Sequence, residues 1–168
     1  MRYNDSRERM EINDRIRGCI QIEQTIASIY SDFMNRFPVE KEFWEGLFYD
    51  EVEHASFMNG VDYLKIIPGL PKEVSLPESP YIAKTMEYAL SVQNQIKFKQ
   101  VSLEDALKMS LILEESMVET FMNELMVVLN SSDDKSYSRD FEDMLIEERG
   151  HVSKIKNMML NKGYLKMT

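Results

Sequence analysis

Apolar side chains recur at steps of three and four residues along four stretches of this chain, which is the spacing of one face of an α-helix. The stretches span residues 12–37, 43–65, 103–128 and 141–159. Pro38 separates the first two stretches, and the polar run 131–134 ends the third. The pattern therefore predicts four long helices, each with one apolar face to bury.

Residues 67–102 interrupt this pattern. The segment holds four of the five prolines, followed by a shorter apolar stripe over about 81–99 that predicts one extra helix. Ser102, with Glu104 and Asp105 after it, has the sequence of an N-cap followed by acids in the first turn, so the third long helix should begin there.

Long helices bury their apolar stripes best by packing nearly antiparallel to one another. We therefore expect an all-α fold, a single domain over residues 1–168 built as an antiparallel four-helix bundle. Its first helical hairpin would cover about 6–66, a long crossover carrying the short extra helix about 67–102, and its second hairpin about 103–162.

Composition narrows the classes of function. The net charge of −9 argues against nucleic acid and against an anionic membrane surface as partners, because both are bound through basic residues. Cys19 is the single cysteine, which excludes an intrachain disulfide. The sequence has no apolar run typical of a signal peptide or a membrane span. We expect a cytoplasmic protein with no nucleic-acid and no membrane partner.

Six polar residues lie in the apolar stripes, where core side chains are expected. The tetrapeptide Glu-x-x-His occurs twice, and residues three apart share a helix face. A lone glutamate lies in each of the other two stripes. The six residues are Glu23, Glu51, His54, Glu114, Glu148 and His151. In four-helix bundles such a set, converging from four helices, binds two metal ions.

The charges of this set also suit a buried metal pair. Burying four carboxylates is costly unless cations match them. Two divalent ions carry a charge of +4, and neutral histidines complete the coordination without adding charge. Single Glu-x-x-His matches are common on exposed helices, but all six residues here are in phase with apolar stripes. Imidazole with carboxylate suits iron or manganese.

Several neighbouring residues leave alternatives open. Glu115 and Glu119 could add a second carboxylate near Glu114. Asp50 and Glu147 each precede the Glu of a Glu-x-x-His motif, and either could accept a hydrogen bond from the histidine of the opposite half or face solvent. Tyr30 either packs in the core or acts beside the site as a hydrogen-bond donor or radical trap.

These motifs resemble those of the ferritin-like superfamily, particularly bacterioferritins and rubrerythrins. The runs Asp-Glu-Val-Glu-His at 50–54 and Glu-Glu-Arg-Gly-His at 147–151 are similar to its two copies of Asp/Glu-Glu-x-x-His, and Tyr30 matches a site tyrosine. The resemblance covers about 12–165 at the level of motifs. It implies a di-iron centre in which Glu51 and Glu148 bridge the ions and Glu23, Glu114, His54 and His151 are terminal ligands.

The resemblance implies an oxidoreductase that reduces H2O2 or O2 while oxidising Fe(II), as a peroxidase or ferroxidase of the rubrerythrin kind. The rubredoxin cysteines of rubrerythrins are missing, and Val52 stands where bacterioferritins place a haem-ligating Met. We therefore expect a separate electron donor, no haem, and a homodimer holding two iron ions, with manganese or a mixed Fe/Mn pair as alternatives. An iron storage or iron-handling protein and a helical interaction module with a structural metal site remain alternative functions.

Overall fold

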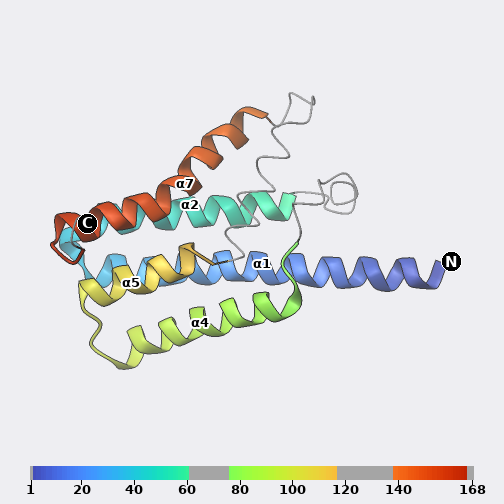
Figure 1. Cartoon of the computed structure of the whole chain (residues 1–168), viewed down its shortest axis with the longest axis horizontal. Coiled ribbons are helices and arrows are strands. Elements are labelled where there is room, and N and C mark those ends of the chain that lie inside the picture. The colour runs from blue at the N-terminus through green and yellow to red at the C-terminus, as the bar shows by residue number, and fades with distance from the viewer. Residues whose placement is uncertain (1, 61–75, 117–137, 166–168) are drawn as a thin grey trace.

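The computed structural model describes residues 2–60, 76–116 and 138–165, and the side chains of 10–56, 58–59, 76–116 and 150–165. Every regular element within these ranges is a helix, in the order α1, η1, α2, α4, α5 and α7 (Figure 1). The expected all-α class is therefore confirmed for the described part of the chain. No helix among these residues is long and apolar enough to cross a membrane.

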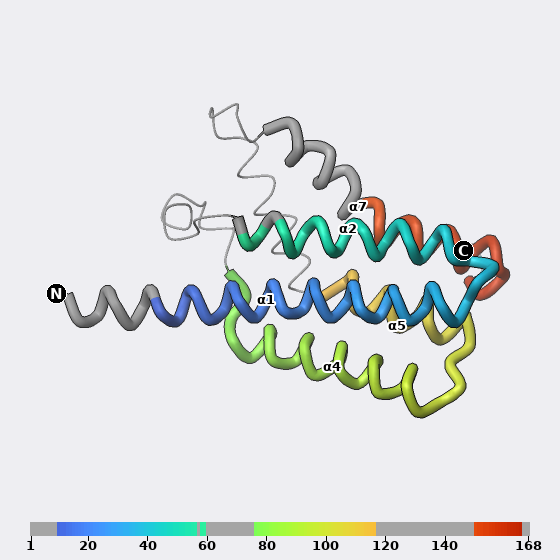
Figure 2. Tube along the Cα trace, turned by 180° about the vertical axis from the view of Figure 1, so that it is seen from behind, coloured from blue at the N-terminus to red at the C-terminus, as the bar shows by residue number. Residues whose placement is uncertain are grey.

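The first hairpin is formed by α1 (Arg2–Arg36) and α2 (Lys41–Gly60), which lie side by side and run in opposite directions (Figures 1 and 2). The one-turn 3-10 helix η1 (Pro38–Glu40) joins them. Phe37 leaves the helical conformation, with φ −118° and ψ 72°, because the proline after it disfavours the α region. The break predicted at Pro38 is confirmed.

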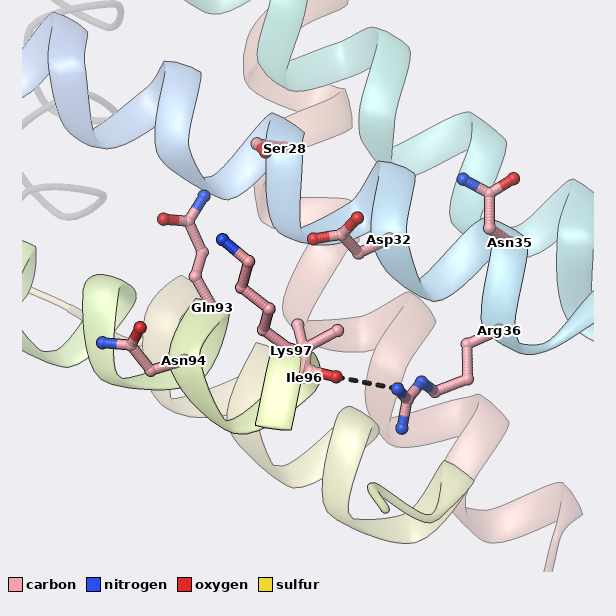
Figure 3. A pocket seen from close by; sticks show the side chains of 8 residues that line it. All are labelled: Ser28, Asp32, Asn35, Arg36, Gln93, Asn94, Ile96 and Lys97. Atoms are coloured by element: carbon pink, nitrogen blue, oxygen red, sulfur yellow. Dashed lines mark hydrogen bonds between the residues drawn. The ribbon is translucent and has the colours of Figure 1, made fainter. Parts of the chain in front are cut away.

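The crossover contains α4 (Ser79–Phe98), which begins two residues before the predicted helix and packs along α1. Gly18 of α1 permits a close approach, because a Cβ there would lie 2.6 Å from Cγ2 of Ile82. Arg15 donates to the carbonyl oxygens of Leu76 and Pro77, just before α4. At the other end of α4, Arg36 donates to the carbonyl oxygens of Ile96 and Lys99 (Figure 3 shows the first). Two arginines of α1 thus anchor both ends of α4.

The helix α5 (Leu103–Glu114), which follows α4, begins with a capping box. The Ser102 side chain accepts from the backbone N–H of Asp105, and the Asp105 side chain accepts from that of Ser102, which confirms the N-cap predicted there. The predicted continuous helix through residue 128 is wrong at its middle, because α5 ends at Glu114 and Glu115 takes φ −86° and ψ 11°. Neither Gly nor Pro explains this end, and residues 117–137 lie outside the described structure.

The last helix, α7 (Ser138–Asn161), contacts α5. After its end at Asn161, Gly163 has a φ of +76°, which lets the N–H of Tyr164 donate to the carbonyl oxygen of Met159. Because the crossover returns the chain along the molecule, α2 and α5 run in the same direction, opposite to α1 and α7 (Figure 1). The Glu-x-x-His helices α2 and α7 are thereby brought beside the helices that carry the lone glutamates.

The hydrophobic core lies between the apolar faces of these helices. Its largest fully buried side chains include Trp44, Tyr30, Phe33, Ile26, Leu47, Met58, Leu107 and Leu113. Cys19 is buried among them. Trp44 is 0% exposed and packs against Tyr30, Phe33 and Phe43, so it belongs to the core.

Candidate metal centre

Five of the six predicted ligands have described side chains, and all five are buried together in the centre of the molecule. Glu23 comes from α1, Glu51 and His54 from α2, Glu114 from α5 and His151 from α7. Each falls on its helix's apolar stripe, so the packing that buries the stripe also buries the polar group. The convergence therefore follows directly from the helical period.

The first group consists of Glu23, Glu51 and His54. Nδ1 of His54 lies 3.7 Å from Oε2 of Glu23 and 3.5 Å from Oε2 of Glu51. One ligand atom from each of the three side chains lies within 4.8 Å of the others. The three residues are thus close enough to share one ion.

The second group consists of Glu51, Glu114 and His151. Nδ1 of His151 lies 3.3 Å from Oε1 of Glu51 and 3.2 Å from Oε2 of Glu114. These three side chains also bring one ligand atom each within 4.8 Å of the others. The imidazole rings of the two groups are stacked, with centroids 5.8 Å apart.

Glu51 belongs to both groups. Its Oε2 faces His54 and its Oε1 faces His151, so each oxygen is turned toward a different histidine. A carboxylate held in this way can give one oxygen to each of two cations. The geometry is compatible with the bridging role that the resemblance implies for Glu51.

Asp50 and Lys154 hold the imidazole ring of His151 on the side away from the glutamates. Nε2 of His151 lies 2.8 Å from Oδ2 of Asp50, and Nζ of Lys154 donates to the same oxygen at 3.1 Å. The carboxylate on Nε2 leaves Nδ1 facing the glutamates, as is usual for metal-binding histidines. Of the two places that the sequence left open for Asp50, the structure shows the one against the opposite half's histidine.

Tyr30 connects the core to the site. Its hydroxyl donates a hydrogen bond to Oε1 of Glu114. Its ring also packs against Trp44, with centroids 5.9 Å apart. Tyr30 is therefore both a core aromatic and a hydrogen-bond donor, the two roles that the sequence presented as alternatives.

Burial and proximity shift the pKa values of the five groups in different directions. Burial, with the charge of Glu51 added, raises the pKa of Glu23 to about 8 and also raises that of Glu114. Burial also opposes ionisation of Glu51, but the two histidines outweigh it and hold its pKa below the usual range. Burial would lower the pKa of His151, but Asp50, Glu114 and Glu51 raise it to about 12. Without metal, His151 and Glu23 therefore hold protons at neutral pH.

A metal ion fits this donor set because the polar atoms are not satisfied otherwise. Both oxygens of Glu23 and both oxygens of Glu51 are buried and have no hydrogen-bond partner among the described residues. Buried polar atoms are normally hydrogen-bonded, since an unpaired one costs about 1–3 kcal/mol. Four such carboxylate oxygens beside two imidazoles are the chemistry of a cation site.

The remaining predicted residues fall outside this set or outside the described side chains. Glu148 and Glu147 lie within the backbone of α7, but their side chains are not among those described, and neither is any part of Glu119. Glu115 is exposed and pairs with Lys156 at 2.7 Å, so it does not join the cluster. Lys154 was not predicted from the sequence, although its position three residues after His151, on the same helix face, was a usable signal.

A groove of about 660 Å³ between α1 and α4 lies apart from this cluster (Figure 3). Its polar side chains, including Asp32, Asn35, Asn94 and Lys97, are open to solvent. The guanidinium of Arg36 is committed to the carbonyl oxygens at the end of α4. The groove shows no buried polar group that would select a ligand.

Comparison with known proteins does not add to this picture. No protein-family model matches the chain, and neither the curated proteins nor the solved structures include a match.

Proposed function

We propose that this chain is a di-metal carboxylate protein with a ferritin-like four-helix bundle, and that its ions are iron. The described helices are compatible with such a bundle, with α1, α2, α5 and α7 surrounding the carboxylates and α4 outside them. The observation that carries the proposal is Glu51, whose two oxygens face two histidines between two further glutamates.

The side chains have separate roles in holding the ions. Glu51 bridges the two positions, Glu23 and His54 complete one, and Glu114 and His151 complete the other. Glu148, whose side chain is not described, is the proposed second bridge and brings the count of carboxylates to four. Four carboxylates neutralise two divalent ions, and this neutrality offsets the free-energy cost of burying the charges in a low-dielectric interior.

The proposed activity is the reduction of H2O2 or O2 coupled to oxidation of Fe(II). A pair of redox-active ions at this site would supply the two electrons that either oxidant needs first. The protein's own residues bind the ions, exclude bulk water through the surrounding core, and orient Glu114 and His151 through Tyr30 and Asp50. The sequence has a single cysteine and no Cys-x-x-Cys pair, so electrons would return from a separate donor protein or small reductant.

The test is metal analysis of protein purified from iron-replete cells, followed by anaerobic Fe(II) loading and a challenge with H2O2 and, separately, with O2. We expect two iron ions per chain and oxidation faster than in protein-free buffer. Binding of fewer than two ions per chain at saturating Fe(II) would refute the di-metal assignment. Two bound ions with no accelerated oxidation would refute the redox activity and leave a structural site. The particle mass separates a dimer from a storage shell.

A further inference from the structure

The two terminal glutamates occupy corresponding places in the two hairpins, but the protein holds them differently. Oε1 of Glu114 accepts the hydrogen bond of Tyr30, and its Oε2 lies 3.2 Å from Nδ1 of His151. Neither oxygen of Glu23 has a hydrogen-bond partner among the described residues, and Oε2 lies 3.7 Å from Nδ1 of His54. Among the described residues, a tyrosine hydroxyl therefore holds one oxygen of Glu114, and no hydroxyl holds either oxygen of Glu23.

This difference limits how each carboxylate can bind a cation. Carboxylates coordinate hard cations through one oxygen or through both. Chelation through both requires the carboxylate to turn its two oxygens toward the same ion. The phenol of Tyr30 holds Oε1 of Glu114 toward α1, which leaves Oε2 as the oxygen that faces His151. Among the described residues no hydroxyl restrains Glu23 in this way, so it can offer both oxygens.

We propose that the two metal positions are unequal, that the position at Glu114 and His151 keeps a coordination place open for a small exogenous ligand, and that Tyr30 is the positioning residue that keeps it open. Metal sites that bind substrate retain such a place, whereas structural sites are closed by protein ligands. The ligand class is a small donor such as water, peroxide or azide. This inference rests on the proposed function, since it names which of the two ions receives the oxidant.

Cobalt(II) and azide test the inequality without any turnover. The full chain is titrated anaerobically with Co(II), and the visible d–d absorption is followed, because its intensity falls as the coordination number rises. Azide is then added to the loaded protein. The variants are Tyr30→Phe, which removes one hydroxyl at nearly constant volume, and Tyr88→Phe as a matched control. Tyr88 is half-buried beside Lys84 and Ile112 and makes no hydrogen bond to the five described ligands. Glu114→Gln assigns the responsive ion.

In the unmodified protein we expect two Co(II) ions with unequal absorption, of which azide changes one, and we expect Glu114→Gln to remove that response. In Tyr30→Phe the stronger absorption should fall toward the weaker, because Glu114 can now chelate, and the azide affinity should fall at least about tenfold. Tyr88→Phe should match the unmodified protein.

Two results would overturn the inference while leaving the di-metal assignment intact. One is an unmodified protein in which azide titrates both ions alike, a result that does not depend on the folding of any variant. The other is a Tyr30→Phe protein with an unchanged spectrum and unchanged azide affinity. An unmodified protein that binds fewer than two Co(II) ions overturns the inference together with the proposed function, and the stoichiometry distinguishes this case.

Discussion

The two halves of the carboxylate cluster differ in how far the protein satisfies them by itself. In the half formed by Glu51, Glu114 and His151, a tyrosine, an aspartate and an imidazolium already supply hydrogen bonds and charge. In the half formed by Glu23, Glu51 and His54, both oxygens of Glu23 lack a hydrogen-bond partner among the described residues. Similar ligand sets can therefore depend on a bound cation to different degrees, because the protein supplies more hydrogen bonds to one set than to the other.

Glu51 is the one described residue common to both halves, so its replacement should have the largest effect. Glu51→Gln removes the charge and one of the two anionic oxygens that face the histidines. We expect the metal stoichiometry to fall from two to at most one per chain, with at least about 100-fold weaker binding of the ion that remains, as for loss of several kcal/mol of charge pairing. Calorimetric titration with Fe(II) under anaerobic conditions measures both quantities.

Glu53→Gln is the matched control, because Glu53 is exposed two residues further along α2. It should bind two ions with unchanged affinity. Equal loading of the Glu51 and Glu53 variants would contradict the assignment of Glu51 as the shared ligand.

The pH dependence of the metal-free protein should show how far bound protons, one in each half, stabilise the cluster. The pKa of His151 is raised from 6.5 to about 12 and that of Glu23 from 4.5 to about 8, so the folded state binds more protons than the unfolded state between these values. The stability that these protons provide is complete below the unfolded pKa values and is lost as the pH rises through the folded ones. Chelated protein should therefore lose on the order of 1–3 kcal/mol of unfolding free energy between pH 7 and pH 9.

Urea unfolding of chelated and metal-loaded protein at both pH values measures this loss. Loaded protein should lose less, because the ions replace the protons and bind more tightly as competing protons leave. A metal-free protein whose stability is constant or rises over this range would show that the cluster is not held by protons.

Asp50→Asn should weaken the half at His151 while leaving its metal ligands in place. The amide of the variant can still contact Nε2 of His151. It lacks the negative charge that orients the imidazole ring and that pairs with Lys154. Loss of such a supporting residue costs about 10–100-fold in metal affinity. We expect this loss for one of the two ions, and no change in Asp14→Asn, whose aspartate lies on the exposed face of α1. If both ions weaken equally, Asp50 does not act through His151 alone.

The helical period was sufficient to predict the buried cluster, and the spacing rules were sufficient for most of the helix ends. Glu23, Glu51, His54, Glu114 and His151 are in phase with stripes that must be buried, and the structure buries all five. The end at Pro38 and the capping box at Ser102 follow from local chemistry. These features depend on short-range geometry, which a sequence records.

Contacts between side chains that are far apart in the sequence were not predictable in the same way. The contact between Tyr30 and Glu114 joins residues 84 positions apart, and that between Asp50 and His151 joins residues 101 positions apart. The sequence could offer each only as one of two alternatives, because an aromatic in a stripe also packs and an acid beside a motif also faces solvent. The end of α5 at Glu114 has no proline or glycine to announce it.

The smallest expected effect is also the sharpest test of the comparison, because the two terminal glutamates should respond with opposite sign. At pH 9 Glu23 is ionised and buried beside Glu51, so Glu23→Gln should raise the unfolding free energy of the chelated protein by about 1 kcal/mol. Glu114→Gln should lower it by about 1–2 kcal/mol, because His151 loses an ion-pair partner in the core.

Urea unfolding at pH 9 with chelator measures both shifts, and Glu11→Gln on the exposed face of α1 serves as the control. Shifts of the same sign would mean that the two halves are equally satisfied without metal. Opposite signs would show that Glu23 is the carboxylate that requires a cation. Its removal would then raise the unfolding free energy of the metal-free protein and lower the affinity for the ion. At Glu23, a variant that stabilises the metal-free protein and weakens ion binding would identify a ligand rather than a residue that only packs.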